Sequence, residues 1–124
     1  MKRHLIAGVL LLSACGATAP PKTPAQALIE GYAALGSATA AFNVYAGQRP
    51  FCGDAGAKPA PLCADRDIVI QGDAAAHQVA DAMDRAGAVI KAVNVADTQW
   101  AALVEPENLL AQFRALVARV TGGK

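Results

Sequence analysis

The chain has little of what most enzymes and nucleic-acid-binding proteins use. Its formal net charge is only +1, with 11 basic and 10 acidic residues, so charge gives no reason to expect nucleic-acid binding. Beyond residue 15 it contains one serine, Ser37, and one histidine, His77, and Ser37 is expected in the middle of a helix. We therefore expect neither a catalytic site nor a cofactor.

Long hydrophobic runs and aromatic side chains are also scarce. No uninterrupted apolar run reaches the roughly 20 residues that span a bilayer as a helix. Aromatic residues make up only 5% of the chain, and alanine is the dominant residue. Alanine favours helices but fills a core poorly, so we expect helices around a thin core, with a covalent staple to support them.

The first fifteen residues have the order of a secretory signal peptide. Lys2 and Arg3 give a positive start, residues 5–12 are apolar, and small residues lead to Cys15. An apolar run of this length suits a cleaved leader and is too short for a transmembrane helix. The sequence therefore predicts export.

The end of this leader, Leu12-Ser13-Ala14-Cys15, resembles the lipobox of bacterial lipoprotein precursors. The resemblance implies that the Cys15 thiol receives a diacylglyceryl group and that a peptidase removes residues 1–14. Two or more acyl chains would then hold the mature protein stably on a membrane without spanning it.

The residue after the cysteine bears on location. In Gram-negative lipoproteins an Asp there resembles an inner-membrane retention signal, so Gly16 favours the outer membrane, facing the periplasm. Pro20 and Pro21 favour an extended tether in front of the folded part. The expected organisation is a signal peptide (1–14), a lipidated cysteine with a flexible tether (15–23) and a helical domain (24–124).

With Cys15 assigned to lipid, two cysteines remain. Cys52 and Cys63 form an even pair in an oxidising compartment, which predicts a disulfide. Metal binding and redox activity are less favoured, because no other Cys or His lies nearby and the spacing is not Cys-x-x-Cys. The disulfide would staple the loop 47–64, which is rich in Gly and Pro.

Three helices are expected. Thr23 as N-cap and Pro24 at the first helical position predict a helix that ends near Gly47. A second helix should run from about Asp65 to about Asn94. The core stripe of the first helix is expected to comprise Leu28, Tyr32, Leu35, Thr39, Phe42 and Ala46. That of the second is expected to comprise Ile68, Gly72, Ala75, Val79, Ala82, Ala86, Val89 and Val93, widened by Met83 and Ile90.

The last quarter of the chain is harder to assign. Residues 95–105 are ambiguous, with Asp97 a candidate cap for a short turn. Pro106 is expected in the first turn of a shorter third helix, since proline is tolerated there. The sequence predicts an all-α fold: a small antiparallel three-helix bundle with a disulfide-stapled loop between the first two helices.

Two groups of residues are candidate sites. Asp73, His77 and Asp81, followed by Asp84, lie on one helix face and could ligate a divalent ion. The alternative, which we favour, is a solvated face with weak Asp–His attraction.

The second group could contact a protein partner. It comprises Arg49, Phe51 and Lys58 in the disulfide loop. Trp100 is either a core plug at one end of the bundle or an exposed contact residue.

These features predict a membrane-anchored, non-enzymatic lipoprotein that binds a protein partner or supports the envelope. One alternative is a phage-derived envelope lipoprotein that acts in host lysis or superinfection exclusion. Outer-membrane lysis lipoproteins resemble it in size and leader but are often richer in proline. A metal-dependent enzyme is the remote alternative.

Overall fold

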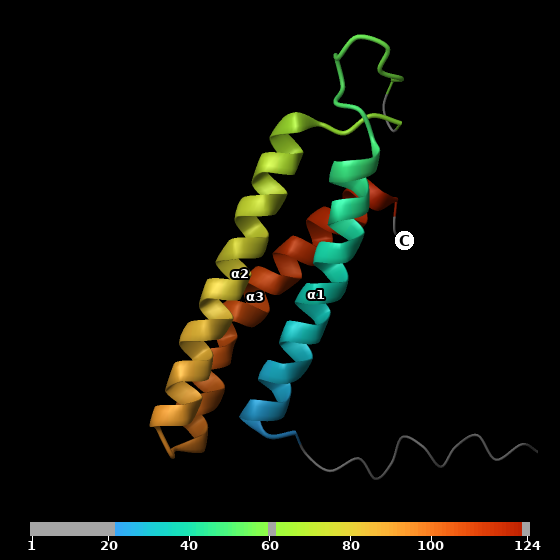
Figure 1. Cartoon of the computed structure of the whole chain (residues 1–124). Coiled ribbons are helices and arrows are strands. Elements are labelled where there is room, and N and C mark those ends of the chain that lie inside the picture. Colours follow the sequence, from blue (N-terminus) through green and yellow to red (C-terminus); the bar gives the residue numbers. More distant parts are fainter. Residues whose placement is uncertain (1–21, 60–61, 123–124) are drawn as a thin grey trace, which may run out of the picture.

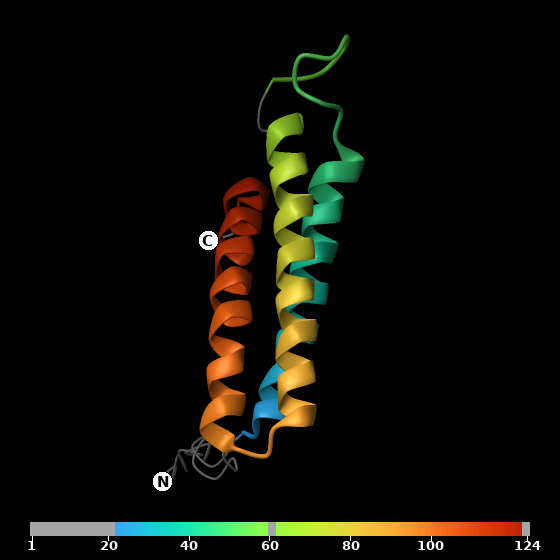
Figure 2. The same cartoon turned by 90° about the vertical axis from the view of Figure 1, so that its left-hand side faces the viewer.

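The computed structural model describes residues 22–59 and 62–122. Three long helices occupy most of this part of the chain: α1 (Pro24–Gln48), α2 (Arg66–Ala92) and α3 (Ala96–Thr121). They form an up-down-up bundle in which α2 runs antiparallel to α1 and α3, and every helix packs on the other two (Figure 1). The loop between α1 and α2 stands clear of the helix ends (Figure 2). The predicted antiparallel three-helix bundle is confirmed.

Local sequence signals set the starts of the first two helices. Thr23 and Gln26 form a reciprocal capping box at α1, with the Gln26 N–H donating to Thr23 Oγ1 at 3.2 Å. Asp65 caps α2, where its Oδ1 accepts from the backbone N–H groups of Asp67 and Ile68. Both caps satisfy amide groups that the first helical turn leaves without a partner.

The third helix corrects the sequence prediction. Pro106 lies inside α3, not in its first turn, and α3 starts at Ala96 after Val95, so Asp97 is not the N-cap. A proline inside a helix removes one backbone hydrogen bond. The Pro106 ring is, however, fully buried in the bundle, and this apolar burial offsets the loss. The 26-residue helix is therefore as long as the other two.

A glutamine holds the sharp link between α2 and α3. The Gln99 side-chain amide donates to the carbonyls of Ile90, at 2.9 Å, and Val93, at 2.7 Å. Carbonyls in the last turn of a helix have no partner within the helix, so one side chain from α3 caps the end of α2. At the other end of α3, Gly122 adopts the left-handed conformation and its N–H bonds to Ala118.

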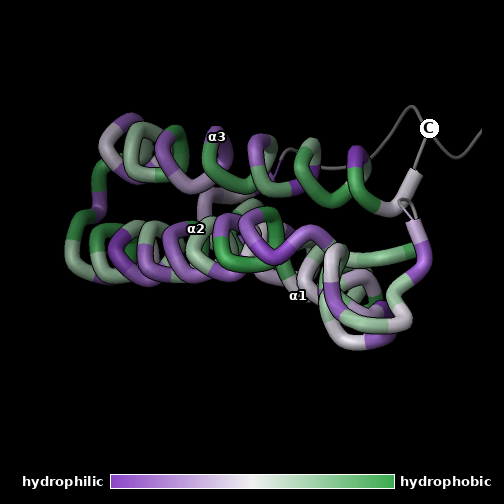
Figure 3. Tube along the Cα trace, turned by 90° about the horizontal axis from the view of Figure 1, so that it is seen from above, coloured by the Kyte–Doolittle hydropathy of each residue, from purple (hydrophilic) through white to green (hydrophobic). Residues whose placement is uncertain are grey.

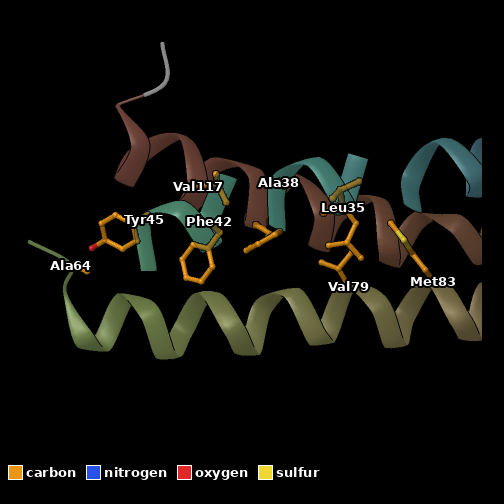
Figure 4. Packing of buried hydrophobic residues seen from close by; sticks show 10 residues of the cluster. Leu35, Ala38, Phe42, Tyr45, Ala64, Val79, Met83 and Val117 are labelled. Carbon is orange, nitrogen blue, oxygen red and sulfur yellow. The ribbon is translucent and has the colours of Figure 1, made fainter. Parts of the chain in front are cut away.

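The core cluster lies where the three helices face one another, from Leu35 to Tyr45 on α1 and from Leu110 to Val117 on α3 (Figure 4). On α1 it uses Leu35 and Phe42 as expected, together with Tyr45. The sequence predicts Tyr32 in the core, but this residue is 39% exposed. The buried stripe of α1 includes Ala38 and Tyr45 in place of the predicted Thr39 and Ala46, and Tyr32 lies at its edge. Hydrophobic and hydrophilic residues alternate within the turns of α2 and α3 (Figure 3). The core members are Leu35, Ala38, Phe42, Tyr45, Ala64, Val79, Met83, Leu110, Phe113 and Val117.

The tightest contact in the core places a phenylalanine on a glycine. Phe42 points from α1 to Gly72 on α2, where an added Cβ would lie 2.1 Å from Cζ of the ring. The same ring makes an edge-on contact with Phe113 of α3, with centroids 5.9 Å apart. Phe42 therefore joins all three helices at one level, and only glycine at position 72 leaves room for it.

This contact gives a stability prediction. Gly72→Ala should lower the free energy of unfolding by about 2 kcal/mol, because the new methyl group overlaps a ring that packing holds in place. Urea denaturation followed by circular dichroism measures the change. Combining Gly72→Ala with Phe42→Leu should recover part of the loss. Gly47→Ala, where an added Cβ meets no atom within 4 Å, should change stability by less than about 0.5 kcal/mol.

Candidate functional site

The loop between α1 and α2 is closed by covalent and hydrogen bonds. Cys52 and Cys63 form the predicted disulfide, with Cα atoms 4.9 Å apart. Beside it the Cys52 N–H donates to the Ala64 carbonyl at 2.9 Å, and the Ala64 N–H donates to the Pro50 carbonyl at 2.8 Å. These bonds hold the two ends of the loop together, and residues 53–59 project from one end of the bundle (Figure 1).

Two arginines lie on aromatic rings at the base of this loop. The Arg49 guanidinium is 5.2 Å from the centroid of Tyr45, and that of Arg66 is 4.2 Å from the centroid of Phe51. Arg66 also lies 3.4 Å from a carboxylate oxygen of Asp54 within the loop. Each contact is individually weak, but together they fix the orientation of three charged groups.

A buried tyrosine connects this end to the helices. The Tyr45 hydroxyl accepts a hydrogen bond from the Asp65 N–H at 2.8 Å, which ties the last turn of α1 to the cap of α2. Its ring packs near Phe42, with centroids 6.1 Å apart. The loop end is therefore continuous with the core.

A groove of about 300 Å³ opens beside the disulfide, where α1 ends, α2 begins and α3 ends. Its walls combine apolar side chains and the disulfide with two guanidinium groups and the carboxylate of Asp65, which accepts the capping hydrogen bonds of α2. Such a surface suits a ligand segment with an apolar body and a carboxylate. The lining residues are Tyr45, Arg49, Cys52, Cys63, Asp65, Ile68, Arg119 and Val120.

The structure separates the predicted contact residues into two places. Arg49, Phe51 and Lys58 lie at the loop end, where Lys58 is exposed and the other two are half-buried. Trp100 lies near the start of α3, at the opposite end of the bundle, and is 40% exposed (Figure 1). Arg119 was not predicted to lie near the loop. The up-down-up order of the helices could have predicted this position, because it places the ends of α1 and α3 together.

The weak metal candidates on α2 are not assembled into a ligand set. His77 Nδ1 lies 2.8 Å from the Asp73 carbonyl and 3.8 Å from a carboxylate oxygen of the same residue. The hydrogen bond to that carbonyl, followed by the Asp73 charge, raises the pKa of His77. Within residues 22–59 and 62–122, no group of three or more His, Cys, Asp or Glu side chains is placed to hold a metal ion. Asp81 therefore has no partners with which to complete a site.

Asp84, the next acid on this helix, bonds to α1. The Tyr32 hydroxyl donates a hydrogen bond to its carboxylate. That hydrogen bond, together with partial burial and the Asp84 charge, raises the pKa of Tyr32 from 10.0 to about 12. The pair ties α1 to α2 at the surface.

Ser37 and His77 line different grooves. The Ser37 hydroxyl donates to the Ala33 carbonyl at 3.1 Å and faces a groove between α1 and α3. His77 lines a shallow hollow between α1 and α2 with Leu35 and Thr39. The two side chains do not form a nucleophile–base pair.

The predicted leader and lipidation site, including Cys15, lie outside the described residues. Among the residues that are described, no helix is both long and apolar enough to cross a membrane. The chain matches no protein-family model, no curated protein and no solved structure.

Removing the disulfide should destabilise the fold. For a cysteine separation of 11 residues, the chain-entropy model gives a loss of about 3 kcal/mol for the double variant Cys52→Ser/Cys63→Ser. Denaturant melts with and without a reductant measure this loss. The reductant should destabilise the unsubstituted chain to a similar extent and leave the double variant unchanged. A double variant as stable as the unsubstituted chain would contradict the prediction.

The Tyr32–Asp84 pair predicts how stability depends on alkaline pH. The folded pKa of about 12 is above the unfolded value of 10.0, so the folded chain retains a proton that the unfolded chain releases. The stabilisation is therefore complete below pH 10.0 and is lost as the pH rises toward about 12. Urea melts at a series of pH values should show this decline, which Tyr32→Phe removes and Tyr45→Phe retains.

Proposed function

We propose that this chain is the precursor of a bacterial lipoprotein whose mature bundle is anchored to a membrane through Cys15. The observation that carries the proposal is the leader, in which a basic start, an apolar run and Leu12-Ser13-Ala14-Cys15 follow in order. The disulfide adds support, because Cys52 and Cys63 pair with each other and leave Cys15 as the remaining thiol. Gly16 favours the outer membrane, facing the periplasm.

The anchored bundle acts in this proposal as a non-enzymatic module that binds an envelope protein through its loop end. Support comes from the arrangement of the described chain. Thr23, where the tether meets α1, lies at the end of the bundle opposite the disulfide loop (Figure 1). The 25 residues of α1 extend about 37 Å, so the loop would be presented away from the lipid.

The groove at the loop end favours a particular kind of partner segment. Arg49 reaches it from the residue after α1 and Arg119 from the last turn of α3, and Ile68 and Val120 supply apolar surface beside them. A segment that combines apolar side chains with a carboxylate would match both properties.

Expression of the full chain in a Gram-negative bacterium tests the anchor. Intact mass spectrometry should find a mature protein that begins at an acylated Cys15 and partitions with the membrane fraction. Cys15→Ala should keep its leader and incorporate no labelled palmitate. Cys52→Ala/Cys63→Ala is the matched control and should still be acylated. Labelled fatty acid in Cys15→Ala, or cleavage at another residue, would refute the proposal.

Site-specific photocrosslinking in cells tests the partner surface. A photoreactive residue at Lys58 or Arg119 should give one discrete crosslinked protein, while the same residue at Lys91, exposed at the opposite end, should not. Phe51→Ala should reduce the crosslink at position 58. Equal crosslinking from Lys91 would show that the loop end is not the binding surface.

A further inference from the structure

Large apolar side chains are exposed at the end of the bundle where α1 begins and α2 joins α3 (Figure 1). Val95, Trp100 and Val104 belong to the start of α3 and are 55%, 40% and 55% exposed. Ile29, in the second turn of α1, is 68% exposed at the same end. We call these four residues the anchor-end patch. Exposed apolar side chains gathered at one place are typical of a surface that meets an apolar partner.

The only tryptophan of the chain lies in this patch. Trp100 belongs neither to the core cluster nor to the half-buried residues packed on it, although a chain so rich in alanine has few large side chains for its core. Its ring combines a large apolar surface with one N–H donor, which favours the boundary between hydrocarbon and water. Val104 lies one turn further along α3, so the two side chains leave the helix on the same side.

The length of chain before α1 limits how far this end can lie from an anchor at Cys15. Only residues 16–23 separate Cys15 from Pro24, the first residue of α1. A fully extended chain covers roughly 3.3–3.6 Å per residue, which keeps Pro24 within about 32 Å of the acylated cysteine. Contact between the patch and the bilayer would then be an intramolecular event, for which a weak surface suffices.

The backbone and the charges at this end suit a medium with less water. The Gln99 side chain donates to the Ile90 and Val93 carbonyls, which would otherwise need water at the end of α2. Removing water from an unpaired carbonyl is costly, so this cap lowers the cost of contact with lipid.

The described charges within two turns of this end cancel. Lys22 pairs with Glu30, and Lys91 and Asp97 add one charge of each sign. The net charge therefore neither attracts nor repels an anionic bilayer, and contact with lipid would depend on the apolar side chains.

We propose that the anchor-end patch rests on the phospholipid bilayer, with the Trp100 ring at the level of the headgroups. This contact rests on the proposed anchor at Cys15 and adds a second attachment to it. Two attachments at one end hold the bundle end-on, with the disulfide loop facing away from the lipid. A bundle held only by the chain before Thr23 would have no such fixed orientation.

Trp100 fluorescence tests the contact, because no other tryptophan contributes to the emission. The mature acylated protein is purified in detergent and reconstituted into phosphatidylcholine vesicles, either plain or brominated near the top of the acyl chains. Bromine quenches only rings that lie close to it. Trp100 emission should fall at least twofold in the brominated vesicles, and replacing phosphatidylcholine by anionic phosphatidylglycerol should leave this ratio unchanged.

Moving the tryptophan gives the matched control. Trp100→Phe/Leu62→Trp places the only tryptophan at the loop end, where Leu62 is 56% exposed, and its emission should be the same in both kinds of vesicle.

Substitutions in the patch provide the second readout. Val95→Asp/Val104→Glu should reduce the quenching of Trp100 at least twofold, because a carboxylate resists transfer to the bilayer. The fold should survive, since both positions are exposed and the new carboxylate at 95 supplies the side-chain cap that α3 lacks. Val44→Asp, at a 52% exposed position near the loop end of α1, should leave the quenching unchanged.

The outcomes separate the contact from the anchor. A protein that carries no acyl group on Cys15 and does not float with the vesicles refutes the anchor, and the contact with it. An acylated protein that floats with the vesicles, but whose Trp100 emission is the same in plain and brominated lipid, overturns the contact alone. Equal quenching of the tryptophan at position 62, or quenching that Val95→Asp/Val104→Glu does not reduce, also overturns it.

Discussion

The bundle depends on the contact between the Phe42 ring and the bare backbone of Gly72. In a chain so rich in alanine, few side chains are large enough to join three helices, and Phe42 touches α2 and α3 at once. Its position fixes how far α1 can slide along α2, since any other residue at 72 would collide with it. Tyr45 lies one turn further along α1. Its hydroxyl accepts the hydrogen bond from the Asp65 N–H, which fixes the start of α2 against the end of α1. The core and the loop end are thus set by one stretch of α1.

Much of this fold follows from local signals in the sequence. Thr23 with Pro24 and Asp65 mark helix starts whose capping bonds involve only neighbouring residues, and assigning Cys15 to lipid leaves one possible disulfide. Pro106 could not be placed in this way, because its position depends on burial by the rest of the bundle. The exposure of Tyr32 was missed for a related reason. Helical spacing alone does not decide which of two adjacent stripes faces the neighbouring helices.

The candidate site was only partly accessible to sequence reasoning. A Gly- and Pro-rich loop with two cysteines identifies a projecting, stapled segment, and Arg49, Phe51 and Lys58 belong to it by position. Arg119 joins them only because three long helices bring the end of α3 beside the end of α1.

An odd number of helices has a practical consequence. The described chain enters the bundle at one end with Thr23 and leaves it at the other with Thr121, close to the groove beside the disulfide (Figure 1). An affinity tag or fluorescent protein fused after Lys124 would therefore crowd the surface where a partner is expected to bind, and the proposed cleavage before Cys15 would remove one fused before Met1. The link at Asn94, exposed between α2 and α3, is the better place for a label. It lies at the far end of the bundle from the loop, and a small dye there would also report on contact with lipid.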